Sequence, residues 1–145
     1  MITHQIVFRA LLITSCGYAL WRGNRDERIV ALVCLGATIL SRLTNAPESI
    51  RYTGVETSLL LIDVVVLATF ICVALQSRRF WPLWVAGLQL TSSTAHLMKL
   101  LDEHLPPIAY GAAIVLWSYP ILIILAVATW RGQRRLQQGR AAGHV

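Results

Sequence analysis

Hydrophobic positions along the chain gather in five long runs that are separated by short polar segments. The runs are much longer than a β-strand, and apolar and polar positions do not alternate within them, so the pattern predicts helices. Pro82 and Pro107 near the starts of the last two runs suit the first turn of a helix. We therefore expect an all-α fold with helices at about 5–21, 28–43, 55–76, 80–101 and 107–130.

The composition indicates that these helices lie in a membrane. Hydrophobic residues make up 56% of the 145 residues and charged residues 14%, whereas a water-soluble domain carries about 25% charged residues. Five spans of about 20 residues take up roughly two-thirds of such a chain. We expect an integral membrane bundle of five transmembrane helices, with a single transmembrane domain over 1–130 and a basic cytoplasmic tail over 131–145.

The second run is the least certain span because it is short. Its 15 residues at 29–43 extend about 22 Å as a helix, whereas the hydrocarbon core of a bilayer is about 30 Å thick. This run can span only if Arg28 and Arg42 extend their side chains toward the headgroups, or if the bilayer thins locally.

The distribution of basic residues favours all five spans. With five spans, one side of the membrane collects nine basic residues and the other side four; without the second span, the split is seven against six. Because basic residues concentrate on the cytoplasmic side, we expect the N-terminus outside and the C-terminus in the cytoplasm. The nine residues are Arg22, Arg25, Arg28, Arg78, Arg79, Arg131, Arg134, Arg135 and Arg140.

Aromatic residues mark the same boundary. Trp21, Trp81, Trp84 and Trp130 fall there, as an interfacial belt does, and the first and fifth runs end in near-identical pentapeptides, WRGNR at 21–25 and WRGQR at 130–134. The net charge of +6 reflects this asymmetry, and we exclude nucleic acid as a partner. We expect the basic tail to lie on anionic headgroups of the cytoplasmic leaflet.

Ionisable residues inside membrane spans are costly and often functional. In the expected topology Asp63 lies about eight residues deep, Ser93 is level with it, and His96 lies one turn outward. We expect Asp63 to contact His96 or Ser93, and a second pair to form nearer the outer surface between Glu56 and Lys99. Arg9 enters at similar depth. The candidate intramembrane polar site is therefore Arg9, Glu56, Asp63, Ser93, His96 and Lys99.

Two interpretations of this polar site remain open. Polar side chains between membrane helices often act only as interhelical contacts, each worth about 0.6 kcal/mol. Alternatively, the cluster lines an outward-facing hydrated vestibule that ends at Asp63 and His96, where the pair relays protons or binds a cation. Histidine ordinarily titrates near neutral pH, which suits a proton role.

Other chemistry is weakly represented. The sequence contains no serine-nucleophile motif, P-loop or dinucleotide-binding motif, so we expect no enzymatic activity. His96 is the one histidine clearly inside a span, so we expect neither a haem nor another cofactor, and no metal site. Pro120 should kink the fifth helix and free the carbonyl of Leu116.

The segments FWPLWVAGLQL at 80–90 and WSYPIL at 117–122 resemble those of short multi-spanning membrane proteins of alphaproteobacteria. The resemblance favours a bacterial inner membrane and implies no site residue. Our leading hypothesis is a non-enzymatic accessory or interaction subunit, with a second copy or another membrane protein as partner. The alternative is an oligomeric transporter or channel component that uses Asp63 and His96 for proton or cation handling.

Overall fold

The computed structural model describes the backbone of residues 2–44, 54–101 and 107–142, and the side chains of 6–43, 58–98, 101 and 116–141. The described residues form helices and short connections without any strand, so the predicted all-α fold is confirmed. The helices are α1 (Ile2–Arg22), α2 (Arg25–Thr44), α3 (Gly54–Gln76), α4 (Trp81–Leu101) and α5 (Pro107–Ala142).

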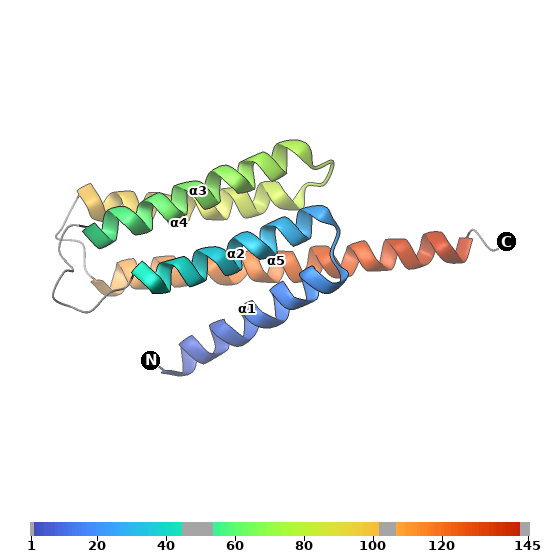
Figure 1. Cartoon of the computed structure of the whole chain (residues 1–145), viewed down its shortest axis with the longest axis horizontal. Helices are drawn as coiled ribbons and strands as arrows, with labels where there is room; N and C mark the ends of the chain where they lie inside the picture. The colour runs from blue at the N-terminus through green and yellow to red at the C-terminus, as the bar shows by residue number, and fades with distance from the viewer. Residues whose placement is uncertain (1, 45–53, 102–106, 143–145) are drawn as a thin grey trace.

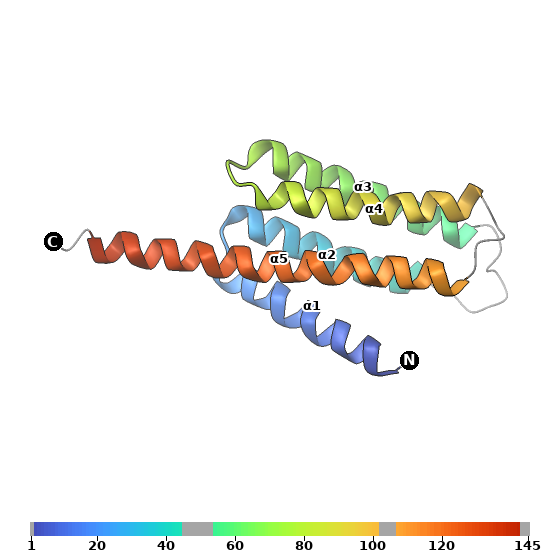
Figure 2. The same ribbon diagram turned by 180° about the vertical axis from the view of Figure 1, so that it is seen from behind.

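The helices form an up-and-down bundle in which each helix packs against the next one in the chain (Figure 1). α5 closes the arrangement because it contacts α1 as well as α4, and it also reaches α2. The N-terminal end of α1 leans away from the other helices (Figures 1 and 2). We call the end of the bundle that carries Arg22, Arg79 and Arg131 the arginine-rich end.

α2 is long enough to cross a hydrocarbon core although its apolar run is not. It has 20 residues, or about 30 Å at 1.5 Å per residue. It begins before the apolar run because Asn24 and Glu27 cap it: the Asn24 carbonyl accepts from the Arg28 N–H at 3.0 Å, and the Glu27 carboxylate accepts from the Asn24 N–H at 2.6 Å. This second bond is one half of a capping box.

α5 is longer than the sequence pattern predicts. The predicted transmembrane span ends at about residue 130, whereas the helix itself continues to Ala142 and comprises 36 residues. Its last turns project beyond the bundle (Figure 2). Arginine, glutamine, leucine and alanine dominate 131–142 and are strong helix formers, so the change from apolar to polar residues does not end the helix. α5 also runs through Pro120, and the kink expected there stays a prediction.

By length and hydropathy, one stretch of the described residues, Ser58–Gln76 in α3, is apolar enough to cross a membrane. The other helices carry polar residues within their length. Arg9 interrupts α1, α2 begins with four charged residues at 25–28, and α4 contains His96 among several hydroxyl side chains.

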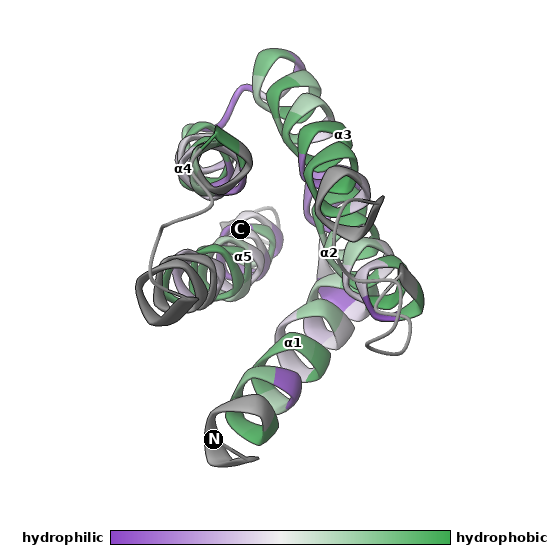
Figure 3. Ribbon diagram, turned by 90° about the vertical axis from the view of Figure 1, so that its left-hand side faces the viewer, coloured by the Kyte–Doolittle hydropathy of each residue, from purple (hydrophilic) through white to green (hydrophobic). Residues whose placement is uncertain are grey.

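Polar and apolar residues are distributed unusually between the interior and the surface. The core contains buried Cys16, Val30, Phe70 and Leu125. Among the described side chains, six that are buried are polar or charged: Ser15, Glu27, Gln89, Ser92, Ser93 and Thr129. In contrast, every helix exposes large apolar side chains, and the hydrophobic colour covers most of the described part of α3 in Figure 3. Examples that are more than half exposed are Ile13, Leu32, Leu61, Leu90 and Leu116.

Candidate functional site

A cavity of about 400 Å³ lies between the helices, and all five contribute to its lining. We call it the central cavity. Its walls are largely apolar, and Phe8, Val66 and Phe70 are among them. Its polar lining residues are Thr38, Ser41, Arg42, Asp63, Gln89, Ser92, His96 and Ser118.

Asp63 and His96 meet at this cavity, as the count of residues along α3 and α4 predicts. His96 Nε2 lies 3.8 Å from Asp63 Oδ2, and the two side chains are 10% and 19% exposed. The Ser93 hydroxyl donates to the same carboxylate oxygen at 3.4 Å. The structure therefore contains the expected contact of Asp63, and it involves both candidate partners.

Both contacts are long for a carboxylate in this setting. Hydrogen bonds between a hydroxyl and an oxygen are usually 2.5–3.0 Å long, and an ionised carboxylate has about four acceptor positions. Asp63 therefore keeps acceptor capacity beside an open volume. Because an ionised carboxylate in an apolar setting is costly without close partners, this position suits a proton or a small cation.

The other predicted site residues do not join this pair in the described structure. Arg9 is exposed on α1 and is not among the residues that line the cavity, so its part in the site stays a prediction. Phe8 and Leu12 are the residues of α1 that face the cavity, and a one-residue step rotates a helix by about 100°. The side chains of Glu56 and Lys99 lie outside the described residues, and so does their expected contact.

The structure adds Arg42 to the cavity. From the sequence, Arg42 is expected to extend its side chain toward the headgroups. In the structure its side chain lines the cavity together with Ser41 and Thr38. Beside the cavity, Phe8 and Tyr119 meet edge to face with ring centroids 5.7 Å apart, which joins α1 to α5. The spacing of Thr38, Ser41 and Arg42 along one helical face is the signal that indicates this polar wall.

The cavity does not extend to the arginine-rich end. Along α3, α4 and α5, the lining residues nearest that end are Phe70, Gln89 and Leu122. One turn farther on, Val73, Val85 and Leu125 are buried in the apolar core. The central cavity therefore lies in one half of the bundle, and buried apolar side chains between the helices separate it from the other half.

A second polar cluster lies at the arginine-rich end, and its centre is Glu27. This side chain is completely buried, and Arg79 Nη1 donates to its Oε1 at 2.7 Å. Asp26 beside it accepts a hydrogen bond from the Ser77 hydroxyl at 2.7 Å. These contacts join the start of α2 to the connection between α3 and α4. The sequence signal for Glu27 is its capping-box spacing from Asn24.

The two similar pentapeptides pack against each other at this cluster. The Gln133 amide donates to the Arg22 carbonyl, which the end of α1 leaves without a helical partner. A Cβ on Gly132 would lie 3.4 Å from Asn24 Nδ2 and 3.8 Å from Glu27 Oε1. These are ordinary van der Waals distances, so α5 lies close to the turn between α1 and α2 at Gly132. The sequence predicts that both segments lie at the same membrane boundary, but it does not predict their contact.

The chain matches no protein-family model, no curated protein and no solved structure. The resemblance of 80–90 and 117–122 to alphaproteobacterial membrane proteins therefore stays a prediction.

Proposed function

We propose that this chain is a five-span protein of a bacterial inner membrane, with its N-terminus outside. The surface of the bundle supports a membrane location. Large apolar side chains are exposed on every helix, while charged and hydroxyl side chains are buried between the helices. Soluble monomers rarely expose large contiguous apolar patches. The apolar stretch in α3 is only 17% buried, which is unlike the core helix of a soluble protein.

The membrane topology is tested with reporter fusions. A fluorescent protein that folds only in the cytoplasm is expected to be bright at the C-terminus. A phosphatase active only outside the inner membrane is expected to be active at the N-terminus and inactive at the C-terminus. Extraction of the chain from membranes by alkaline carbonate, or an active phosphatase at the C-terminus, would contradict the five-span arrangement.

Within this membrane protein, we propose that Asp63 binds a proton or a small cation as part of a transport system. The observation that carries this proposal is a cavity of about 400 Å³ at Asp63 and His96, where the contacts of the carboxylate with the described side chains of His96 and Ser93 are long. A dry interhelical contact would need no such volume. Because buried apolar side chains separate the cavity from the other half of the bundle, a complete pathway requires a conformational change, a second copy or a partner protein.

The proposal is tested by the stability of the purified full chain. A ligand that binds only the folded state at 100 times its Kd stabilises that state by about 2.7 kcal/mol. We expect addition of sodium or potassium ions to raise the unfolding temperature. Asp63→Asn should remove this response, while Arg9→Gln should retain it because Arg9 lies outside the cavity.

Two results would contradict the binding site. One is an equal change in the unfolding temperature of the wild type and Asp63→Asn when either cation is added. The other is loss of the response in Arg9→Gln as well. For the transport role, vesicles that contain the chain should carry protons or cations faster than empty vesicles at some pH between 5 and 8, and Asp63→Asn should abolish the difference.

The second candidate is an accessory subunit in which polar contacts mainly fix the register of the helices. The observation that favours it is the Glu27–Arg79 cluster, which joins three parts of the chain far from the cavity. For this candidate, Asp63→Asn leaves function in the cell intact, whereas substitution of Glu27 lowers the amount of folded protein.

A further inference from the structure

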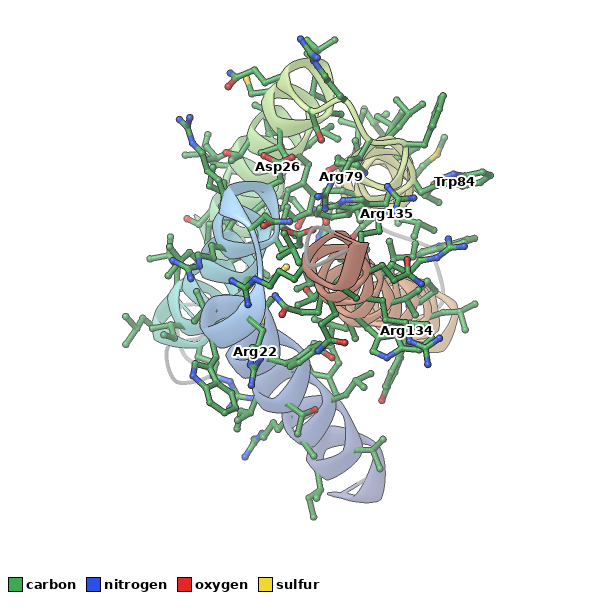
Figure 4. The ribbon with its side chains drawn as sticks, turned by 90° about the vertical axis from the view of Figure 1, so that its right-hand side faces the viewer. Arg22, Asp26, Arg79, Trp84, Arg134 and Arg135 are labelled. Carbon is green, nitrogen blue, oxygen red and sulfur yellow. The ribbon has the colours of Figure 1, made fainter. Side chains whose placement is uncertain are left out.

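A second pocket lies at the arginine-rich end, between α5 and the start of α4. Its volume is about 450 Å³, and we call it the arginine pocket. Arg78, Arg79, Arg131 and Arg135 line it, and its described lining includes no carboxylate. Figure 4 shows Arg79 and Arg135 at this end, next to α4 and α5. Glu27 offsets one of these charges through Arg79, so the pocket keeps an excess of positive charge.

The two arginines of α5 are four residues apart and therefore lie on the same face of the helix. Arg79 is held in place by its ion pair with buried Glu27 at 2.7 Å. α4 begins at Trp81, and the positive end of its dipole favours an anion nearby. Its first turn offers few free N–H groups, because Pro82 has none and the Leu83 N–H donates to the Phe80 carbonyl. These features together define a site for an acceptor group with negative charge.

An unpartnered donor points to the same chemistry. The indole N–H of Trp81 is buried and has no hydrogen-bond partner among the described residues, and Trp81 lines the arginine pocket. A buried N–H without an acceptor costs about 1–3 kcal/mol. A phosphate or ester oxygen bound in the pocket would remove that cost.

The apolar part of the pocket indicates that the ligand is an amphiphile. Ile123, Ile124 and Val127 line the pocket on the α5 side, and they precede Arg131 and Arg135 along the helix. From residue 123 to residue 135, α5 rises about 18 Å. In the proposed orientation the apolar wall lies within the bilayer and the arginines lie at the headgroups. In a phospholipid, the acyl chain and the phosphodiester follow each other along the membrane normal in the same order, and at a similar separation, as the apolar wall and the arginines of the pocket.

We propose that the arginine pocket binds one anionic phospholipid of the cytoplasmic leaflet. The arginines hold the phosphodiester, Trp81 donates to a phosphate or ester oxygen, and an acyl chain lies along the apolar wall of α5. The pocket is open toward the bilayer, since Ile123 is 52% exposed and Phe80 83% exposed. The inference rests on the membrane location proposed above and is independent of the Asp63 site.

The test is native mass spectrometry of the full chain released from detergent, titrated with dioleoylphosphatidylglycerol or dioleoylphosphatidylcholine. We expect one tightly bound phosphatidylglycerol and no comparable phosphatidylcholine. Arg131→Gln with Arg135→Gln should weaken phosphatidylglycerol binding about thirty-fold, because each arginine at a headgroup contributes about 1 kcal/mol. Trp81→Phe should weaken it about five-fold through the lost hydrogen bond.

A matched control distinguishes binding in the pocket from general attraction of the lipid to positive charge. Arg134→Gln with Arg140→Gln removes the same charge from the same helix outside the pocket and should leave binding unchanged. Equal weakening in both double variants, or equal binding of the two lipids, would overturn the proposal. So would full displacement by millimolar inorganic phosphate, because a free anion would then be the ligand. Asp63→Asn should not change lipid binding, which keeps this result separate from the cation site.

Discussion

Removing the charge of Glu27 should destabilise the bundle more than any comparable change at its surface. Glu27→Gln keeps the size of the side chain and an oxygen that can accept from the Asn24 N–H, but it removes the ionic partner of Arg79. The perturbation therefore isolates the charge at a side chain that has no exposed surface.

The structure gives the expected magnitude. Breaking a buried ion pair by removing one partner costs about 3–5 kcal/mol, because the other charge stays buried without compensation. The side chain of Arg79 is 35% exposed, so its guanidinium can recover part of its hydration. The retained helix cap also lowers the cost. We therefore expect Glu27→Gln to lower the free energy of unfolding by about 2 kcal/mol, and Glu27→Ala by about 3 kcal/mol because the cap is also lost.

The measurement is reversible unfolding of the full chain in mixed micelles by sodium dodecyl sulfate, followed by circular dichroism. A double-mutant cycle with Arg79→Gln should give a coupling energy of about 1–3 kcal/mol. Asp26→Asn is the matched control, because its amide oxygen can still accept from the Ser77 hydroxyl; we expect a loss below about 1 kcal/mol. A coupling energy near zero, or equal losses for Glu27→Gln and Asp26→Asn, would refute the reasoning.

Three further substitutions test local packing: two at glycines and one at Gln133. Gly23→Ala should lower the free energy of unfolding by about 2 kcal/mol, since its Cβ would collide with the Ala19 carbonyl oxygen and lie 2.9 Å from the Cβ of Glu27. Gly36→Ala should instead raise it by about 0.5 kcal/mol, because nothing lies within 4 Å of the added Cβ. Thermal unfolding distinguishes the two variants. Gln133→Ala should cost about 1 kcal/mol through loss of the hydrogen bond to Arg22, measured by the same unfolding titration; no change would show that this bond does not hold α5 against α1.

The sequence determined the helices and the depth of Asp63 because both follow from local properties. Hydrophobic runs predict where helices lie, and a fixed rise of 1.5 Å per residue places Asp63 level with Ser93 and one turn from His96. These three side chains meet in the structure. The end of α5 was not determined in this way, because the polar residues after 130 are good helix formers and continue the helix to Ala142.

Only the tertiary structure decided which side chains face the interior. Arg9 shares the depth of the polar site but faces outward, whereas Arg42 lines the cavity. Glu27 looks like one more interfacial charge in the sequence, yet it is buried because α5 and the connection after α3 both cover the start of α2. The rotation of each helix about its axis depends on all of its neighbours at once. A count of residues along one helix predicts how deep a residue lies in the membrane. The packing between helices determines which way its side chain points, and it leaves the central cavity beside Asp63.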